Sequence, residues 1–221
     1  DMPGHGLTRA PADFIASQKA YVGVLDAFAD KIGLKRFALA GNSMGGGIAW
    51  NYALDHPDKL SGLILVDAAG WPDESLKKPP LAFRILMSRP GRWYLQRGET
   101  VPITGPALQA DFHAPALATK PFVERWVAVQ RAPGHRQILM SIQFGGAGAT
   151  REKLSKIAVP TLILHGRDDH IIAPAAAEKF KDAIPGSELV FYPDAGHLPQ
   201  WEQPDRTATD IGSFVTRRAK K

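Results

Sequence analysis

Apolar positions near the start of the chain recur at the spacing of a helix. Between residues 11 and 32 they fall three or four residues apart, which predicts an amphipathic helix with one buried face. Asp13 or Ser17 is suited to begin this helix, because a short polar side chain can accept a hydrogen bond from the first free N–H groups. Gly33 follows the predicted end of the helix, where glycine is common.

Further along the chain, short uninterrupted apolar runs alternate with helical segments. Runs that are apolar on both faces and separated by helices are typical of a parallel sheet covered on two sides. The predicted strands are residues 35–41, 63–66, 160–164 and 188–192. The predicted helices are residues 43–56, which Pro57 ends, 175–183 and 206–215. The pattern therefore predicts an α/β fold with a mostly parallel sheet.

The middle of the chain differs from both flanks. From residue 71 to 150 prolines and glycines are frequent, with aromatic residues and arginines between them. We interpret residues 71–150 as a mainly helical insertion that divides a core made of residues 1–70 and 151–221. Its aromatic residues suit an apolar ligand or simply form the insertion's own core. The aromatic residues concerned are Phe83, Trp93, Phe122 and Trp126.

Composition and charge exclude some classes of function. The 221 residues are 44% hydrophobic and 22% charged, which is ordinary for a globular protein. The net charge is +5, but the basic residues are dispersed except in the terminal run 217–221, so we expect no nucleic-acid partner. No apolar run reaches the roughly 18 residues that a membrane-spanning helix needs. The absence of cysteine excludes disulfides and thiolate metal sites.

A serine in a glycine-rich turn is the first candidate for chemistry. Ser43 lies in Gly41-Asn42-Ser43-Met44-Gly45, between a predicted strand and a predicted helix. This G-x-S-x-G pattern matches the nucleophile elbow, in which a tight turn exposes the serine Oγ at the carboxyl end of a sheet. We expect Gly41 and Gly45 to leave room for the close approach of strand and helix. The Met44 N–H is then a candidate oxyanion-hole donor, although a glycine-rich turn that serine merely caps is the simpler alternative.

A serine nucleophile needs a base and an acid, and both follow in the sequence. His197 stands just past the last predicted strand, where it can act as general base. Asp168 or Asp169, after the strand before it, is the candidate acid that orients the histidine. These two residues with His165 and His170 also suggest a metal site, but no preformed helical pair of histidine ligands supports it. We therefore expect neither metal nor cofactor.

These motifs, in the order nucleophile, acid, histidine, resemble those of the α/β-hydrolase superfamily over essentially the whole chain. Residues 41–46 resemble the nucleophile elbow of the family. Residues 166–169 resemble its acid loop, and residues 196–204 resemble its histidine loop. In the family the acid usually stands three residues after the glycine, which favours Asp169, whereas the proline at 174 falls one residue late and keeps Asp168 open. The resemblance implies a Ser43-His197-Asp169 triad and a helical cap over the active site.

The first residues of the chain resemble an internal part of that family. Residues 1–6 are similar to the loop after its fourth strand, so the chain looks N-terminally truncated. A second oxyanion donor would then lie outside this sequence, and the sheet would have an exposed edge that invites aggregation. We expect residues 1–221 alone to be poorly folded or inactive. The sequence shows no signal peptide, but a missing N-terminus would hide one, so the compartment stays open with the cytoplasm favoured. The oligomeric state does not follow from the sequence.

The resemblance implies a small-molecule substrate and leaves three functions open. We favour a serine hydrolase of carboxylic esters, either esterase, lipase-like or lactonase. The alternative is a C–C bond hydrolase of ring-cleavage products, in which a cap arginine holds an acidic substrate; the candidates are Arg84, Arg125, Arg131 and Arg136. Those enzymes usually carry an aromatic residue after the histidine, where this chain has Leu198. A non-catalytic binding protein of the same fold is the third possibility.

Overall fold

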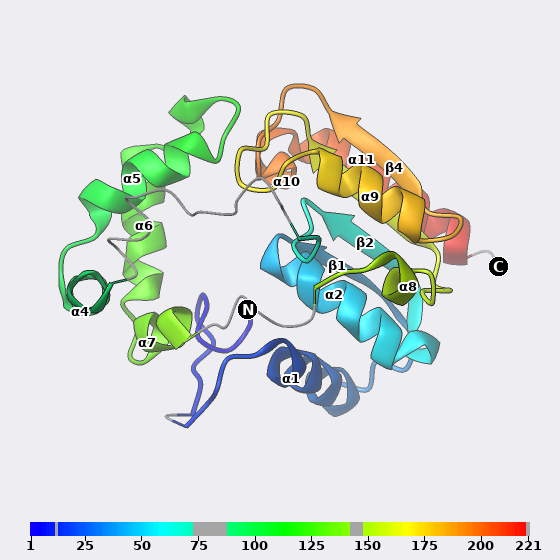
Figure 1. The fold of residues 1–221 in the computed structure, drawn as a ribbon, viewed down its shortest axis with the longest axis horizontal. Coiled ribbons are helices and arrows are strands. Elements are labelled where there is room, and N and C mark those ends of the chain that lie inside the picture. The colour runs from blue at the N-terminus through cyan, green and yellow to red at the C-terminus, as the bar shows by residue number, and fades with distance from the viewer. Residues whose placement is uncertain (12, 73–87, 142–147, 220–221) are drawn as a thin grey trace.

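The protein is an α/β structure in which helices surround one parallel sheet (Figure 1). The computed structural model describes residues 1–11, 13–72, 88–141 and 148–219. The strands are β1 (Phe37–Asn42), β2 (Leu60–Val66), β3 (Thr161–Gly166) and β4 (Glu188–Tyr192). They lie side by side in the order β1-β2-β3-β4, and every neighbouring pair is parallel. The predicted parallel sheet is confirmed, with β2 starting earlier in the chain than its apolar run indicated.

The helices that pack around the sheet follow the sequence pattern closely. They are α1 (Gln18–Lys31), α2 (Met44–Asp55), α8 (Arg151–Leu154), α9 (Ala175–Ala183), α10 (Pro199–Glu202) and α11 (Pro204–Ala219), with the short 3-10 turn η1 (Pro57–Lys59) after α2. The helix expected from residue 11 begins only at Gln18. Ser17 is its cap, because the Ser17 Oγ accepts a hydrogen bond of 3.2 Å from the Ala20 N–H.

Two different groups of helices cover the two faces of the sheet. Successive residues of a strand point to opposite faces, so β2 contributes to two cores. Leu63 and Leu65 pack in the core beneath α2 and α9, whereas Ile64 and Val66 pack on the other face with Phe214 of α11. This arrangement explains why the run is apolar without alternation. β1 forms one edge of the sheet, and Ala40 in its middle is exposed.

The segment between β2 and β3 is helical in its described part and lies beside the sheet (Figure 1). We call its helices the helical insertion: α4 (Arg89–Arg97), α5 (Val101–Ala110), η3 (Pro115–Leu117), α6 (Lys120–Gln130) and α7 (His135–Ser141). It has a small apolar core of its own, formed by Leu108, Phe112, Ala118 and Val123. Residues 73–87 and 142–147, with the candidates Phe83 and Arg84, lie outside the described residues. None of the described helices has the length and apolarity that crossing a membrane requires.

Candidate active site

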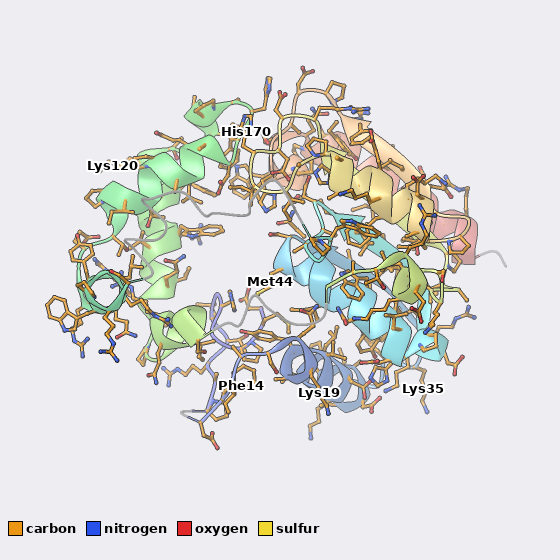
Figure 2. All side chains as sticks on the ribbon, in the orientation of Figure 1. Phe14, Lys19, Lys35, Met44, Lys120 and His170 are labelled. Atoms are coloured by element: carbon orange, nitrogen blue, oxygen red, sulfur yellow. The ribbon has the colours of Figure 1, made fainter. Side chains whose placement is uncertain are left out.

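Ser43 occupies a strained turn where β1 ends and α2 begins. Its φ of 55° and ψ of −119° are unusual for a residue with a side chain, and such strain is common at functional sites. Backbone hydrogen bonds fix the turn against the next strand: the Ser43 N–H donates to the Val66 carbonyl at 3.0 Å, and the Ser43 carbonyl accepts from Ala69 at 2.9 Å. Met44 opens α2, at the end of the helix that faces the helical insertion (Figure 2).

Two glycines make the tight turn possible, and only one of them, Gly41, is a glycine that the motif suggested. A Cβ on Gly41 would lie 2.2 Å from the Gly45 carbonyl oxygen. A Cβ on Gly46 would lie 2.6 Å from the Cβ of Ala68. The expectation for Gly45 was wrong, because a Cβ there would have no heavy atom within 4 Å. Gly46 rather than Gly45 allows the helix to approach the end of β2.

Asp169 and His197 form a buried hydrogen-bonded pair. The His197 Nδ1 lies 2.8 Å from the Asp169 Oδ2, and both residues are less than 8% exposed. The other Asp169 oxygen accepts the N–H groups of Ile171 at 2.7 Å and Ile172 at 2.9 Å. Burial alone would raise the pKa of Asp169, but the hydrogen bonds from His197 and these two amides lower it overall. Asp169 is therefore an ionised carboxylate that orients the imidazole ring.

Asp168, the other candidate acid, faces away from this pair. Its carboxylate contacts the Nδ1 of His113, which follows α5 of the helical insertion, and both side chains are exposed. It thus joins the acid loop to the insertion instead of contacting His197. The Asn42 side chain connects the elbow to the histidine loop, because its Nδ2 donates to the His197 carbonyl at 3.2 Å. Asp169 and His197 are in direct contact, whereas Ser43 is linked to His197 through its neighbour Asn42.

The histidine loop is held by two acidic residues that the sequence analysis did not single out. Glu202 of α10 accepts the Gly196 N–H at 2.6 Å with one oxygen and the His113 N–H at 2.8 Å with the other. The Asp111 carbonyl accepts the His197 N–H at 2.7 Å. Burial raises the pKa of the Asp111 carboxyl group to about 6, against the attraction of His197. Glu202 thus connects the insertion with the loop that carries His197.

Two further buried residues stand behind the Asp169–His197 pair. Asp67 follows β2 and is fully buried, and its Oδ1 accepts the Gly166 N–H at 2.9 Å. His165 of β3 donates from Nε2 to the Ile172 carbonyl at 2.9 Å. In the described part of the chain, Asp67, Asp169 and His197 are the side chains close enough to share a cation. Asp169 and His197 already form a hydrogen bond with each other, so we interpret the three side chains as groups that bind protons rather than a cation.

Of the arginines proposed to hold an acidic substrate, the three that the structure describes have other partners or lie on the surface. Arg131 pairs with Glu99, and Arg136 donates to the Gly98 carbonyl at 3.0 Å and to the Thr100 hydroxyl at 2.9 Å. Arg125 is exposed on α6.

The aromatic candidates of the insertion differ in environment. Trp93 is 60% exposed on α4. Phe122 packs against Phe112, Trp126 and also Trp201 of α10, with a ring-centre distance of 5.1 Å to Trp201. Phe122 therefore belongs to the contact between the insertion and the histidine loop.

Comparison with known proteins gives a consistent picture. Residues 1–204 match the family model described as alpha/beta hydrolase fold. The chain is 26% identical over 201 residues to a 2-hydroxy-6-oxononadienedioate/2-hydroxy-6-oxononatrienedioate hydrolase of Pseudomonas sp, covering 90% of this chain and 69% of the relative. It is 29% identical over 230 residues to monoacylglycerol lipase abhd6-A of Xenopus laevis, covering 98% and 66%. The chain thus spans about two thirds of the length of these relatives.

Solved structures with the same fold include both hydrolase types. The meta-cleavage product hydrolase of Pseudomonas fluorescens IP01 superposes with a TM-score of 0.82 at 20% identity, covering 98% of this chain and 78% of that one. A thermophilic esterase of Thermogutta terrifontis superposes with a TM-score of 0.76 at 26% identity, covering 99% and 78%. The first likeness establishes the fold alone, and neither selects a substrate.

Proposed function

Since the chain belongs to the α/β-hydrolase fold family, we propose that it is a serine hydrolase of carboxylic esters. In this proposal Ser43 is the nucleophile, His197 the general base and Asp169 the acid that orients His197. The buried bond of 2.8 Å between His197 Nδ1 and Asp169 Oδ2 is the observation that carries it. With Nδ1–H donated to Asp169, the Nε2 of His197 is left unprotonated and free to take a proton.

The reaction follows from these roles as an acyl transfer. The Ser43 Oγ attacks the ester carbonyl carbon while the His197 Nε2 takes the hydroxyl proton, and Asp169 stabilises the imidazolium that forms. His197 then gives the proton to the leaving alcohol, and the acyl group stays on Ser43. Water repeats the sequence with the acyl-enzyme, which releases the carboxylic acid and restores the Ser43 hydroxyl.

The oxyanion of the tetrahedral intermediate needs hydrogen-bond donors. We propose the backbone N–H of Met44 as one of them, because the first N–H groups of α2 have no carbonyl partner within the helix. The positive end of the helix dipole at the same place favours negative charge. Removing a single donor of this kind typically slows the reaction by about 100- to 1,000-fold.

An ester fits the described part of the insertion better than a strongly acidic substrate. Arg131 and Arg136 are engaged by Glu99, Gly98 and Thr100 within the insertion itself. The carboxyl group of Asp111 lies next to the histidine loop and would repel an anion there. C–C bond hydrolysis of ring-cleavage products remains the second candidate, because the relatives include a 2-hydroxy-6-oxononadienedioate hydrolase as well as a lipase.

The direct test is labelling with a fluorophosphonate, which reacts only with an activated serine. We expect one covalent adduct per chain by intact mass, lost in Ser43→Ala and kept in Ser213→Ala, which removes an exposed hydroxyl on α11. Hydrolysis of short p-nitrophenyl esters should follow the same pattern. An unlabelled but folded wild-type protein would contradict the proposal and favour a binding protein. Faster turnover of a ring-cleavage product than of any ester would favour the C–C hydrolase.

A further inference from the structure

Asp67 is a buried acid for which the reaction above has no role. It continues the parallel ladder after β2, since its N–H donates to the Leu164 carbonyl at 3.0 Å. Its φ of 41° lies in the left-handed region, which is strained for a residue with a side chain. The side chain is completely buried, and its Oδ2 has no hydrogen-bond partner among the described residues. A strained and buried carboxyl group calls for a physical reason.

Among the described residues, one acid and two histidines lie close to the Asp67 carboxyl group. One oxygen of Asp67, one of Asp169 and a ring nitrogen of His197 lie within 4.8 Å of one another. The Nε2 of His165 lies 3.7 Å from the Asp67 Oδ1 and 3.4 Å from the Asp169 Oδ2. Burial lowers the pKa of His165, so its ring is neutral and donates to Ile172 instead of pairing with an acid.

Because an oxygen of Asp67 and an oxygen of Asp169 lie within 4.8 Å of each other, the negative charge of one carboxylate disfavours ionisation of the other. Asp169 is the one that ionises, because it accepts two backbone amides and His197. Burial raises the pKa of Asp67 to about 9, the Gly166 amide partly opposes this, and the charges of Asp169 and Glu202 raise it further. Asp67 therefore keeps its proton at neutral pH.

We propose that Asp67 is a positioning residue, a neutral carboxylic acid whose O–H donates to the Asp169 carboxylate. The two acids then carry a single negative charge opposite His197. The Gly166 N–H occupies the Asp67 Oδ1, which leaves Oδ2, without a partner among the described residues, to carry the proton. The inference rests on the proposed role of Asp169 and His197, and it explains the orphaned Oδ2 and the tolerated strain together.

Infrared spectroscopy tests the protonation without any use of activity. At pH 7 we expect a band from one protonated carboxylic acid that is present in the wild type, absent in Asp67→Asn and kept in the control Asp58→Asn, which changes an exposed carboxylate. The band should disappear as the pH rises through about 9. Identical spectra of the wild type and Asp67→Asn would overturn the proposal even if Ser43 is the nucleophile.

Steady-state kinetics then test the positioning role. Asparagine can accept from Gly166 and donate an N–H to Asp169, so Asp67→Asn should keep kcat within about threefold. Asp67→Ala should lose kcat on the order of a hundredfold with little change in KM, because Asp169 and His197 lose their support. The fall of kcat/KM above about pH 9 in the wild type should be absent in Asp67→Asn. An Asp67→Asn variant as slow as Asp67→Ala, or an Asp67→Ala variant as fast as wild type, would overturn the proposal.

Discussion

The His197 N–H donates to the Asp111 carbonyl oxygen at 2.7 Å, so a residue of the helical insertion holds the candidate general base. Gly196 lies beside the same contact. A Cβ on this residue would stand 2.4 Å from the Asp111 carbonyl oxygen. A shift of the insertion would therefore move the backbone of His197. The segment that would shape the substrate pocket also sets the geometry of the proposed triad.

Replacing the two adjacent aspartates should separate their roles. Asp169→Asn keeps the size of the side chain but permits the wrong tautomer of His197, which in Ser-His-Asp enzymes costs about 10⁴-fold in kcat. Asp168→Asn changes only an exposed contact with His113, and we expect a loss of less than about 1 kcal/mol in stability and little change in kcat. Ester hydrolysis by the two purified variants measures this. Equal losses in both would show that Asp169 is not the acid.

Adding one methyl group at Gly196 should disturb the contact between the insertion and the histidine loop. The new Cβ would lie 2.4 Å from the Asp111 oxygen and 2.9 Å from the His113 nitrogen, which are both backbone atoms that cannot rotate away. We expect Gly196→Ala to lower kcat/KM on the order of a hundredfold. Gly212→Ala, in an open position on α11, is the control and should raise stability by about 0.5–1 kcal/mol. Unchanged turnover in Gly196→Ala would show that the contact between Gly196 and the backbone of residues 111–113 does not contribute to catalysis.

Glu202 should be needed as a carboxylate. Its two oxygens accept the N–H groups of Gly196 and His113, and glutamine would turn an N–H₂ group toward one of them. Glu202→Gln should cost about 1–3 kcal/mol of stability for the unsatisfied amide and should lower kcat. Glu178→Gln, which removes only an exposed pair with Arg167, is the matched control. Urea denaturation measures the stability of both variants, and ester hydrolysis measures their kcat. Similar results for Glu202→Gln and Glu178→Gln would contradict the bridging role of Glu202.

The raised pKa of Asp67 has a definite sign in the stability of the protein. Between the unfolded value of 3.8 and the folded value of about 9, the folded state holds one proton more than the unfolded state. The stability linked to this proton is complete below pH 3.8 and is lost as the pH rises toward 9, by up to about 1.4 kcal/mol per pH unit. Asp67→Asn should therefore gain stability relative to the wild type between pH 5 and pH 8. A difference in unfolding free energy that stays constant over that range would show that Asp67 is already ionised.

The strands and the direct Asp169–His197 contact could be predicted because each is marked locally in the sequence. Apolar runs long enough for a strand and too short for a helix placed the ends of β1, β3 and β4 to within two residues. The glycine at 166 allowed a choice between Asp168 and Asp169 by family spacing. Asp67 had a weaker signal of the same kind, since an acid directly after the buried run 63–66 belongs at the carboxyl edge of the sheet.

The contacts across the insertion had no comparable signal. Asp111 supplies a backbone carbonyl to His197, and a carbonyl is the same in every residue, so no residue type could identify it. Glu202 stands within the motif of the histidine loop, but its partner His113 lies 89 positions away in the sequence. The helix expected from residue 11 was too long for a simpler reason. Ser17 caps the helix that begins at Gln18; before it, Phe14 packs against the core without being helical, and Ile15 is exposed.

Gly166 and Gly196 have a consequence for engineering this protein. A Cβ on Gly166 would lie 1.9 Å from the Gly196 carbonyl oxygen, and a Cβ on Gly196 would strike Asp111, so three loops are stacked without space for a side chain. Chimeras that import a foreign insertion to change substrate range must therefore carry residues 111–114 together with a matching 196–202 segment. A library that randomises the insertion but keeps residues 111–114 and 196–202 unchanged should yield more active clones than a library that also varies these two segments.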